Sequence, residues 1–306
     1  MDRRRFLGAV PAAALTFAGL RADWANAADA PASTQLAPGL WLISGYGGNV
    51  TLFDSPEGAL LVDGGAPEHA AKLRAEIDRL TGGKPVKVLF NTHWHHDQTG
   101  LNLVLGKADT RIIAHEYTRQ WLTTDVESRW ENRVYKPLPK AALPNDTFYT
   151  TASLQFGGEQ IDYGHLGQAH TDGDIYVFFR KANVLVSGDV VSVGRFPIID
   201  PASNGWIGGL ADAVESLVKL ADEGTRIVPG TGAPQGVAHL KAEAAMLSTM
   251  RQRLARLLAQ GLSAEEMIAA RPAAEFEAAW GDPSLFIRNA YPGLSHRARE
   301  LGVSIV

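Results

Sequence analysis

The sequence predicts an α/β protein in which two β-sheets pack face to face and helices cover both outer sides, a four-layer αββα sandwich. Two observations lead to this fold. The chain of 306 residues contains two groups of short apolar stretches rich in β-formers, each accompanied by segments with helical spacing. In both groups the apolar stretches end in polar residues that can bind metal ions. The chain is 45% hydrophobic, which is enough for a substantial core.

The first half predicts an antiparallel meander followed by a helix and a buried strand. The meander consists of three β-rich stretches, at residues 40–43, 49–53 and 59–63. Apolar residues at helical spacing predict a helix over 69–80, and the apolar run 86–90 predicts a strand. That strand leads directly into a loop with several histidines, and such loops are where α/β folds place their chemistry.

The middle of the chain predicts a further strand, a helix and a proline-rich loop. The strand covers 111–114 and the helix covers about 117–130. Prolines at 137, 139 and 144 predict a loop that borders a substrate cleft.

The second half repeats the pattern of apolar strands that end in polar residues. Its predicted strands are 148–151, 154–156, 159–163, 175–179, 184–187 and 226–229. Helices are predicted over 209–221, 237–260 and 264–270, the second of them long and amphipathic.

The N-terminus has the features of an export signal. Arg3, Arg4 and Arg5 precede an uncharged run over residues 8–20, and Ala25-Asn26-Ala27 forms a small-x-small cleavage site. The paired arginines before Phe6-Leu7 resemble a twin-arginine signal. We therefore expect a signal peptide over residues 1–27, handling by the twin-arginine export machinery, and a periplasmic or secreted product. The run is shorter than the ~20 residues of a membrane span, so we expect no stable span after cleavage.

Composition restricts the partners and the ligands. The formal net charge is −4 and no basic cluster follows the extreme N-terminus, so nucleic acid is not an expected partner. The chain contains no cysteine, so any metal must be held by histidine, carboxylate, amide or hydroxyl groups.

The pattern His93-x-His95-x-Asp97 lies in a predicted loop. It places two imidazoles and a carboxylate in a stretch of five residues. A single histidine is usually a packed or solvated residue. Such a cluster is difficult to explain by packing alone, because buried imidazoles and carboxylates need partners, and a metal ion supplies one. The sequence therefore predicts a metal site here.

Five ordered motifs resemble the metallo-β-lactamase superfamily. They are 61–64 (Leu-Val-Asp-Gly), 92–97 (Thr-His-Trp-His-His-Asp), 169–174 (Ala-His-Thr-Asp-Gly-Asp), 187–189 (Ser-Gly-Asp) and 228–232 (Val-Pro-Gly-Thr-Gly). The resemblance implies the four-layer αββα sandwich of that family over residues 28–235. Residues 236–306 would then form a C-terminal helical extension packed on the same domain.

Carried over residue by residue, the resemblance implies two metal subsites. His93, His95 and His170 match the three-histidine first site, Asp97 matches the second, and Asp189 matches the carboxylate that reaches both. Two positions depart from the pattern: Gln98 and Thr231 stand where the family usually has second-site histidines. Amide and hydroxyl groups are poor zinc ligands beside imidazole, so we expect one zinc and a weakened second site.

The first site alone accounts for hydrolysis. Zinc held by three neutral imidazoles leaves a position for water, whose pKa falls to about 7, giving a metal-bound hydroxide at neutral pH. Asp97 is the candidate catalytic residue that orients this water or accepts its proton. Asp63 is expected to support the ligand loop from behind. The expected function is hydrolysis of a small carbonyl substrate (lactam, lactone, ester or thioester), with β-lactamase activity left open.

Two other interpretations remain open. His93, His170 and Asp189 offer two imidazoles and one carboxylate, a set that suits Fe²⁺ and resembles the persulfide dioxygenase branch of the family. Alternatively, the chain is a catalytically degenerate binding protein that retains one metal.

The remaining histidines have structural explanations. His96 occupies the variable position of the motif and is expected to point away from the metal, and His165 precedes the His170 loop. No ligand-type cluster surrounds His69, His115, His239 or His296 in the sequence. Trp121, Arg129, Trp130, Arg195, Phe196 and Trp206 are candidates for the walls of the cleft, although packing explains them equally well.

Overall fold

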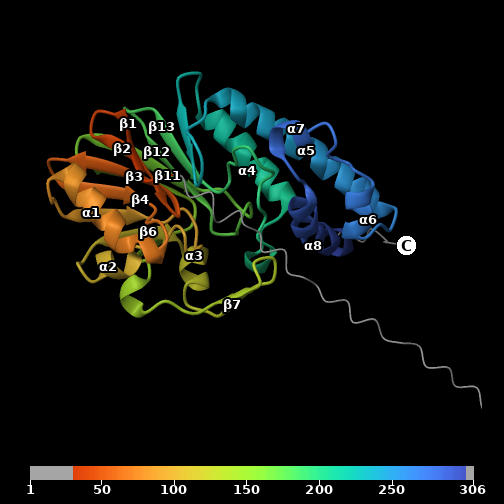
Figure 1. Ribbon diagram of the computed structural model, residues 1–306, viewed down its shortest axis with the longest axis horizontal. Helices are drawn as coiled ribbons and strands as arrows, with labels where there is room; N and C mark the ends of the chain where they lie inside the picture. Colours follow the sequence, from red (N-terminus) through yellow and green to blue (C-terminus); the bar gives the residue numbers. More distant parts are fainter. Residues whose placement is uncertain (1–29, 301–306) are drawn as a thin grey trace, which may run out of the picture.

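A computed structural model describes residues 30–300 of the chain. Within this range the predicted αββα arrangement is confirmed: two sheets lie side by side, with α1 (Ala70–Thr81) outside one and α4 (Ile207–Leu220) outside the other (Figure 1). The expected signal peptide over 1–27 lies outside the described residues.

The first sheet contains seven strands. In order across the sheet they are β1 (Ala32–Ala37), β2 (Leu40–Tyr46), β3 (Gly48–Ser55), β4 (Gly58–Val62), β5 (Val86–Phe90), β6 (Arg111–His115) and β9 (Asp146–Phe148). Pairing is antiparallel from β1 to β4 and parallel from β4 to β9. The carboxyl ends of β4, β5 and β6 therefore meet at one edge.

The second sheet contains five strands. They are β10 (Thr151–Phe156), β11 (Glu159–His165), β12 (Ile175–Phe179), β13 (Val184–Gly188) and β14 (Arg226–Pro229). The pair β13–β14 is parallel and the other pairs are antiparallel. The loops that follow β13 and β14 consequently leave the sheet at the same edge.

The core has three layers, because successive side chains of a buried strand point to opposite faces of the sheet. In β4, Leu60 and Val62 face the second sheet, whereas Leu61 between them faces α1. Successive side chains of a strand point to opposite faces, so a strand that is apolar throughout is buried on both sides. This explains why β4 and β12 are continuous apolar runs rather than alternating ones.

Helices cover the outer faces of both sheets. The outer face of the first sheet packs against α1 and α2 (Asn102–Gly106). The outer face of the second sheet is covered by α4, and the C-terminal helices join the same hydrophobic cluster, with α5 and α8 packed against α4. These are α5 (Val237–Ala259), α6 (Ala264–Ala269), α7 (Glu277–Trp280) and α8 (Ser284–Glu300).

The predicted helix over 117–130 is wrong. Helix α3 covers only Glu116–Trp121, and a two-stranded hairpin follows, formed by β7 (Val126–Ser128) and β8 (Arg133–Tyr135). The hydroxyls of Thr123 and Thr124 donate to carbonyls of the last helical turn, and such side-chain bonds compete with helix continuation. The structure therefore places an additional hairpin beside the histidine loop.

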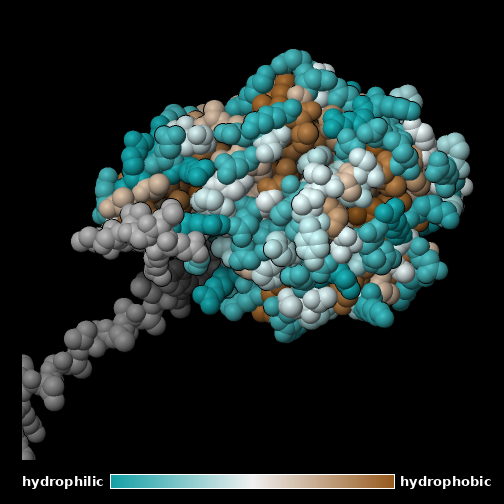
Figure 2. All heavy atoms as spheres, turned by 180° about the vertical axis from the view of Figure 1, so that it is seen from behind, coloured by the Kyte–Doolittle hydropathy of each residue, from teal (hydrophilic) through white to brown (hydrophobic). Residues whose placement is uncertain are grey.

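The face of the molecule drawn in Figure 2 is mostly hydrophilic. In the view of Figure 2, hydrophobic residues form separate groups within a largely polar face. None of the helices within residues 30–300 is both long enough and apolar enough to span a bilayer.

Candidate metal centre

The candidate ligands come from loops at one edge of the two sheets. His93 and His95 follow β5, His170 lies between β11 and β12, and Asp189 directly follows β13. Asp63 directly follows β4. The carboxyl ends of β4, β5 and β13 lie at the same edge of the sandwich. Residues distant in sequence therefore converge there.

Three ring nitrogens meet at this edge. The Nε2 atom of His93 lies 3.1 Å from Nδ1 of His95, and Nε2 of His170 lies 3.0 Å from the same Nδ1. The carboxylate Oδ2 of Asp189 lies 3.8 Å from Nε2 of His93 and 3.9 Å from Nε2 of His170. One atom from each of these four residues lies within 4.8 Å of every other, and within residues 30–300 no further such group of metal-binding side chains occurs.

This donor set fits a metal ion such as zinc. Two nitrogens bound to a tetrahedral zinc at ~2.0–2.1 Å lie about 3.3 Å apart, close to the separations found here. The three histidines are buried, with exposed fractions of 0, 6 and 1% for His93, His95 and His170. Burial and the neighbouring imidazoles lower the pKa of His93 well below its ordinary value and also lower that of His170. Both rings are therefore held in the neutral form that binds metal.

A second contact orients each imidazole. The Nδ1 of His170 lies 2.8 Å from the carbonyl oxygen of Ile198, and Nε2 of His95 lies 3.2 Å from Oδ2 of Asp200. The Nδ1 of His93 lies 3.1 Å from the hydroxyl of Thr92. When the ring nitrogens that face these second partners donate, the other nitrogen of each ring is left as an acceptor. These acceptor nitrogens are Nε2 of His93, Nδ1 of His95 and Nε2 of His170, and they converge on one point.

Asp63 holds the ligand loop from behind, as expected from the sequence. One carboxylate oxygen accepts the backbone N–H of Thr92 and the other accepts its hydroxyl, both at 2.8 Å. Since that hydroxyl donates to Asp63, it accepts from Nδ1–H of His93. Burial raises the pKa of Asp63 well above its ordinary value, while the bonds from Thr92 oppose the rise.

Asp200 is a functional residue that the sequence analysis missed. It precedes Pro201 and caps the short helix η4 (Pro201–Ser203), a role that needs no metal site nearby. Burial favours neutral forms of both Asp200 and His95, but their mutual bond and charges dominate. They lower the pKa of Asp200 well below its ordinary range and raise that of His95 to about 9. The negative charge of Asp200 thus favours positive charge on His95, whether that charge comes from a proton or from a metal at Nδ1.

Two glycines let the sheet ends approach each other. Gly188 has a φ of +54°, and a β-carbon there would lie 2.6 Å from the hydroxyl of Thr92. A β-carbon on Gly230 would overlap the carboxylate of Asp189. Gly188 therefore leaves space for Thr92 of the histidine loop, and Gly230 leaves space for the carboxylate of Asp189.

Asp97, the predicted second-site ligand and catalytic residue, lies outside the four-residue group. Burial raises its pKa, and the charge of Asp189 raises it further. The two carboxylates are therefore close enough to repel each other.

The two positions that depart from the family pattern differ in their surroundings. The side chain of Gln98 is fully buried against Gly48, and neither amide atom has a hydrogen-bond partner. The hydroxyl of Thr231 accepts a hydrogen bond of 3.0 Å from Nη2 of Arg195. Arg195 thus brings a positive charge to the position where the family usually has a histidine.

The other histidines lie outside the group. The two ring nitrogens of His96 face Arg133 and Tyr135 of the β7–β8 hairpin, as expected for the variable position. His115 and His165 stack on each other with ring centroids 3.7 Å apart. His239 bonds to the carbonyl oxygen of Ser192.

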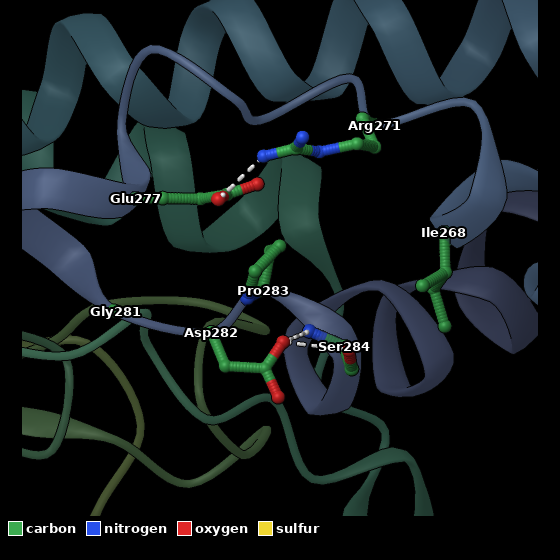
Figure 3. Close-up of a pocket in the computed structure, with 7 residues that line it drawn as sticks. All are labelled: Ile268, Arg271, Glu277, Gly281, Asp282, Pro283 and Ser284. Atoms are coloured by element: carbon green, nitrogen blue, oxygen red, sulfur yellow. Dashed lines mark hydrogen bonds and ion pairs between the residues drawn. The ribbon is translucent and has the colours of Figure 1, made fainter.

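A separate cavity lies among the C-terminal helices (Figure 3). Its walls carry an ion pair of 2.9 Å between Arg271 and Glu277, and Asp282 accepts bonds from the backbone and hydroxyl of Ser284. None of these residues belongs to the group of side chains that could hold a metal among residues 30–300.

Comparisons with known proteins agree with the fold. The family model described as the metallo-beta-lactamase superfamily matches residues 43–244. The metallo-beta-lactamase IND-1 of Chryseobacterium indologenes is 22% identical over 198 residues, which cover 64% of this chain and 76% of that protein. The type 2 metallo-beta-lactamase of Bacillus cereus is 22% identical over 184 residues, covering 60% of this chain and 66% of that protein.

Solved structures show the same fold. A metallo-beta-lactamase from Pontibacter korlensis superimposes with a TM-score of 0.58 and 19% identity, covering 72% of this chain and 99% of that one. The DIM-1 metallo-beta-lactamase superimposes with a TM-score of 0.59 and 18% identity, with the same coverage.

Proposed function

Because this chain belongs to the metallo-β-lactamase superfamily, we propose that it is a zinc-dependent hydrolase of a small carbonyl substrate: a lactam, lactone, ester or thioester. The observation that carries the proposal is the convergence of Nε2 of His93, Nδ1 of His95 and Nε2 of His170, each oriented by a second partner. When bound there, zinc polarises a carbonyl group and lowers the pKa of a water from 15.7 to about 7.

The residues around the proposed zinc have three roles: they bind the metal, orient the attacking water and orient the metal ligands. His93, His95 and His170 hold the metal, and Asp189 adds a carboxylate beside them. Asp97 orients the attacking water and accepts its proton, a role favoured by the raised pKa of its half-buried carboxyl group. Asp63 and Asp200 keep His93 and His95 in the orientation that binds metal.

We further propose that one zinc suffices. Gln98 and Thr231 provide an amide and a hydroxyl where the family pattern has imidazoles, and both are weak zinc ligands. The guanidinium of Arg195 beside Thr231 also disfavours a second cation by charge repulsion.

Metal content provides the test. Elemental analysis of protein purified without chelator should give about one zinc per chain. His170→Ala should lose it, whereas the control His69→Ala, which removes a histidine outside the group, should retain it. Substrate screening with lactams, lactones, esters and thioesters should then find activity that His170→Ala lacks. Inactivity of the zinc-loaded protein on all four classes would exclude the proposed hydrolase and leave the binding-protein interpretation.

An oxidative function is the second candidate. The carboxylate of Asp189 lies 3.8 and 3.9 Å from the inner nitrogens of His93 and His170, so two imidazoles and one carboxylate also converge. This set suits Fe²⁺, as in a sulfur oxygenase of the persulfide dioxygenase type. Iron in the purified protein together with oxygen uptake on a persulfide would favour this function, and zinc without oxygen uptake would exclude it.

Export and domain organisation also belong to the proposal. We propose that residues 1–27 direct the folded protein through the twin-arginine machinery, giving a periplasmic or secreted enzyme. Replacement of Arg4 and Arg5 by lysine should retain the protein in the cytoplasm with residues 1–27 uncleaved. We also propose that residues 236–306 are an extension of the domain at 28–235, supported by the packing of α5 and α8 on α4 and by the hydrophobic cluster that these helices share with the second sheet.

A further inference from the structure

Asp200 is a fully buried carboxylate that connects a metal ligand to the β7–β8 hairpin. Its exposed fraction is 0%, and four donors surround it within the structure. Nε2 of His95 lies 3.2 Å from Oδ2, which also accepts the hydroxyl of Ser203. The other oxygen, Oδ1, accepts the backbone N–H of Ala202 at 3.0 Å and the indole N–H of Trp130 at 3.0 Å.

Trp130 differs from the other donors because it comes from another part of the fold. Ala202 and Ser203 belong to η4, which Asp200 itself caps. Trp130 lies 70 positions earlier in the chain, in the turn of the hairpin formed by β7 and β8. Its indole therefore fixes the carboxylate relative to a separate element.

The hairpin approaches His95 by a second route. The ring of Tyr135, on β8, packs edge-on against Trp94 with centroids 5.2 Å apart. Trp94 in turn packs edge-on against His95 with centroids 4.5 Å apart. Both the outer nitrogen of His95 and one side of its ring are thus held by groups that the hairpin contacts.

We propose that Trp130 is a positioning residue of the metal centre, which acts through Asp200 to hold Nδ1 of His95 toward the metal. The inference rests on the proposed function only in that it requires a metal at His93, His95 and His170. A carboxylate partner fixes both the orientation and the tautomer of a ligating imidazole, so displacement of the carboxylate displaces the ligand. The indole N–H restrains Asp200 from the β7–β8 hairpin, an element separate from η4.

A second tryptophan offers a matched control. The indole N–H of Trp121 donates to Oδ1 of Asp172 at 2.6 Å, in the same region of the fold. The side chain of Asp172 bonds to Trp121 and Asn204, and no hydrogen bond joins it to His93, His95 or His170. Trp121→Phe therefore removes the same chemical group from a buried aspartate without touching the path to His95.

The test is a zinc titration in competition with a chromogenic chelator, on the full mature protein. Trp130→Phe should weaken zinc binding about tenfold, the lower end of the range for outer partners of metal ligands, because Asp200 keeps three other donors. Trp121→Phe should change the affinity by less than about twofold, since no metal ligand depends on it. Equal weakening by both variants, or none by Trp130→Phe, would overturn the proposal.

A double-mutant cycle separates positioning from packing. If Trp130 acts through Asp200, Trp130→Phe should have little further effect on zinc affinity in an Asp200→Ala background. A tenfold effect that persists in that background would show that the indole acts by packing alone and would overturn the proposal. Thermal unfolding without metal establishes that each variant is folded.

A spectroscopic measurement covers the case in which Asp200→Ala does not fold. Substitution of zinc by cobalt(II) gives visible absorption bands that report the ligand geometry. These bands should change in Trp130→Phe and remain as in the wild type in Trp121→Phe, and unchanged bands in Trp130→Phe would contradict the positioning role. Failure of the proposed function is visible separately, because the wild-type titration shows whether zinc binds and the substrate screen shows whether it is used.

Discussion

Gly230 packs so closely against Asp189 that a β-carbon at position 230 would overlap its carboxylate. The backbone N–H of Gly230 also donates to the carbonyl oxygen of Gly188 at 2.8 Å, which ties the ends of β13 and β14 together. The position of the Asp189 carboxylate is therefore set by the absence of a side chain across the loop.

Gly230→Ala should displace Asp189 and lower hydrolytic activity at least tenfold, while the three histidines still retain zinc. Such overpacking of a tight site costs about 1–3 kcal/mol of stability. Gly236→Ala is the control on the same β14–α5 connection, because a β-carbon there meets no atom within 4 Å. Activity assays and zinc analysis of both variants check the prediction, and an unchanged Gly230→Ala enzyme would contradict it.

Thr92→Val should weaken zinc binding by about 10- to 100-fold, the usual effect of losing an outer partner of a metal ligand. The change removes the hydroxyl that connects His93 to Asp63 and leaves a buried carboxylate oxygen without its donor. Thr92→Ser keeps the hydroxyl and should bind zinc nearly as the wild type does. Chelator competition measures both affinities, and a loss in Thr92→Ser as large as that in Thr92→Val would contradict the role of the hydroxyl.

Restoring the two absent imidazoles should create the second site. The double variant Gln98→His, Thr231→His should raise the zinc content from about one to about two per chain, because imidazole binds zinc better than amide or hydroxyl. The histidine at 231 also removes the hydroxyl that binds Arg195. Thr231→Ser is the control and should remain at one. Tight binding of two zinc ions by the wild type would refute the single-metal proposal.

Glu243 should make the protein less stable as the pH rises. Its side chain on α5 is fully buried, and burial raises its pKa well above the ordinary 4.5, while one bond from the backbone of Ser192 opposes the rise. Above pH 4.5 the unfolded chain has lost this proton and the folded chain retains it. Stability therefore falls as the pH rises from 4.5 toward the folded pKa, by up to ~1.4 kcal/mol per unit.

Glu243→Gln removes this proton difference, so its melting temperature should rise relative to the wild type between pH 4.5 and 8. Glu265→Gln provides a control of opposite sign, because the exposed Glu265 has its pKa lowered by a bond to Arg288. Its substitution should lose a small amount of stability in the same pH range. Parallel pH trends for the two variants would count against the explanation.

Local patterns account for what could be predicted. The run 175–179 was predicted as a strand and is β12, because five consecutive apolar residues require burial on both faces. His93 and His95 could be recognised because their spacing lies within one loop. The αββα arrangement followed from the order of such segments, and the family resemblance added His170 and Asp189.

Contacts between distant residues were decided only by the tertiary structure. The segment after Trp121 was expected to continue as a helix and forms a hairpin instead, and the turn of that hairpin reaches Asp200. The bond between His95 and Asp200 spans 105 positions. A single hydrogen bond between distant side chains leaves no periodicity in the sequence, because it depends on where the packed sheets and loops bring the two groups together. The sequence by itself thus determined the strands, the histidine motif and the supporting role of Asp63, and only the tertiary structure brought Asp200 to His95.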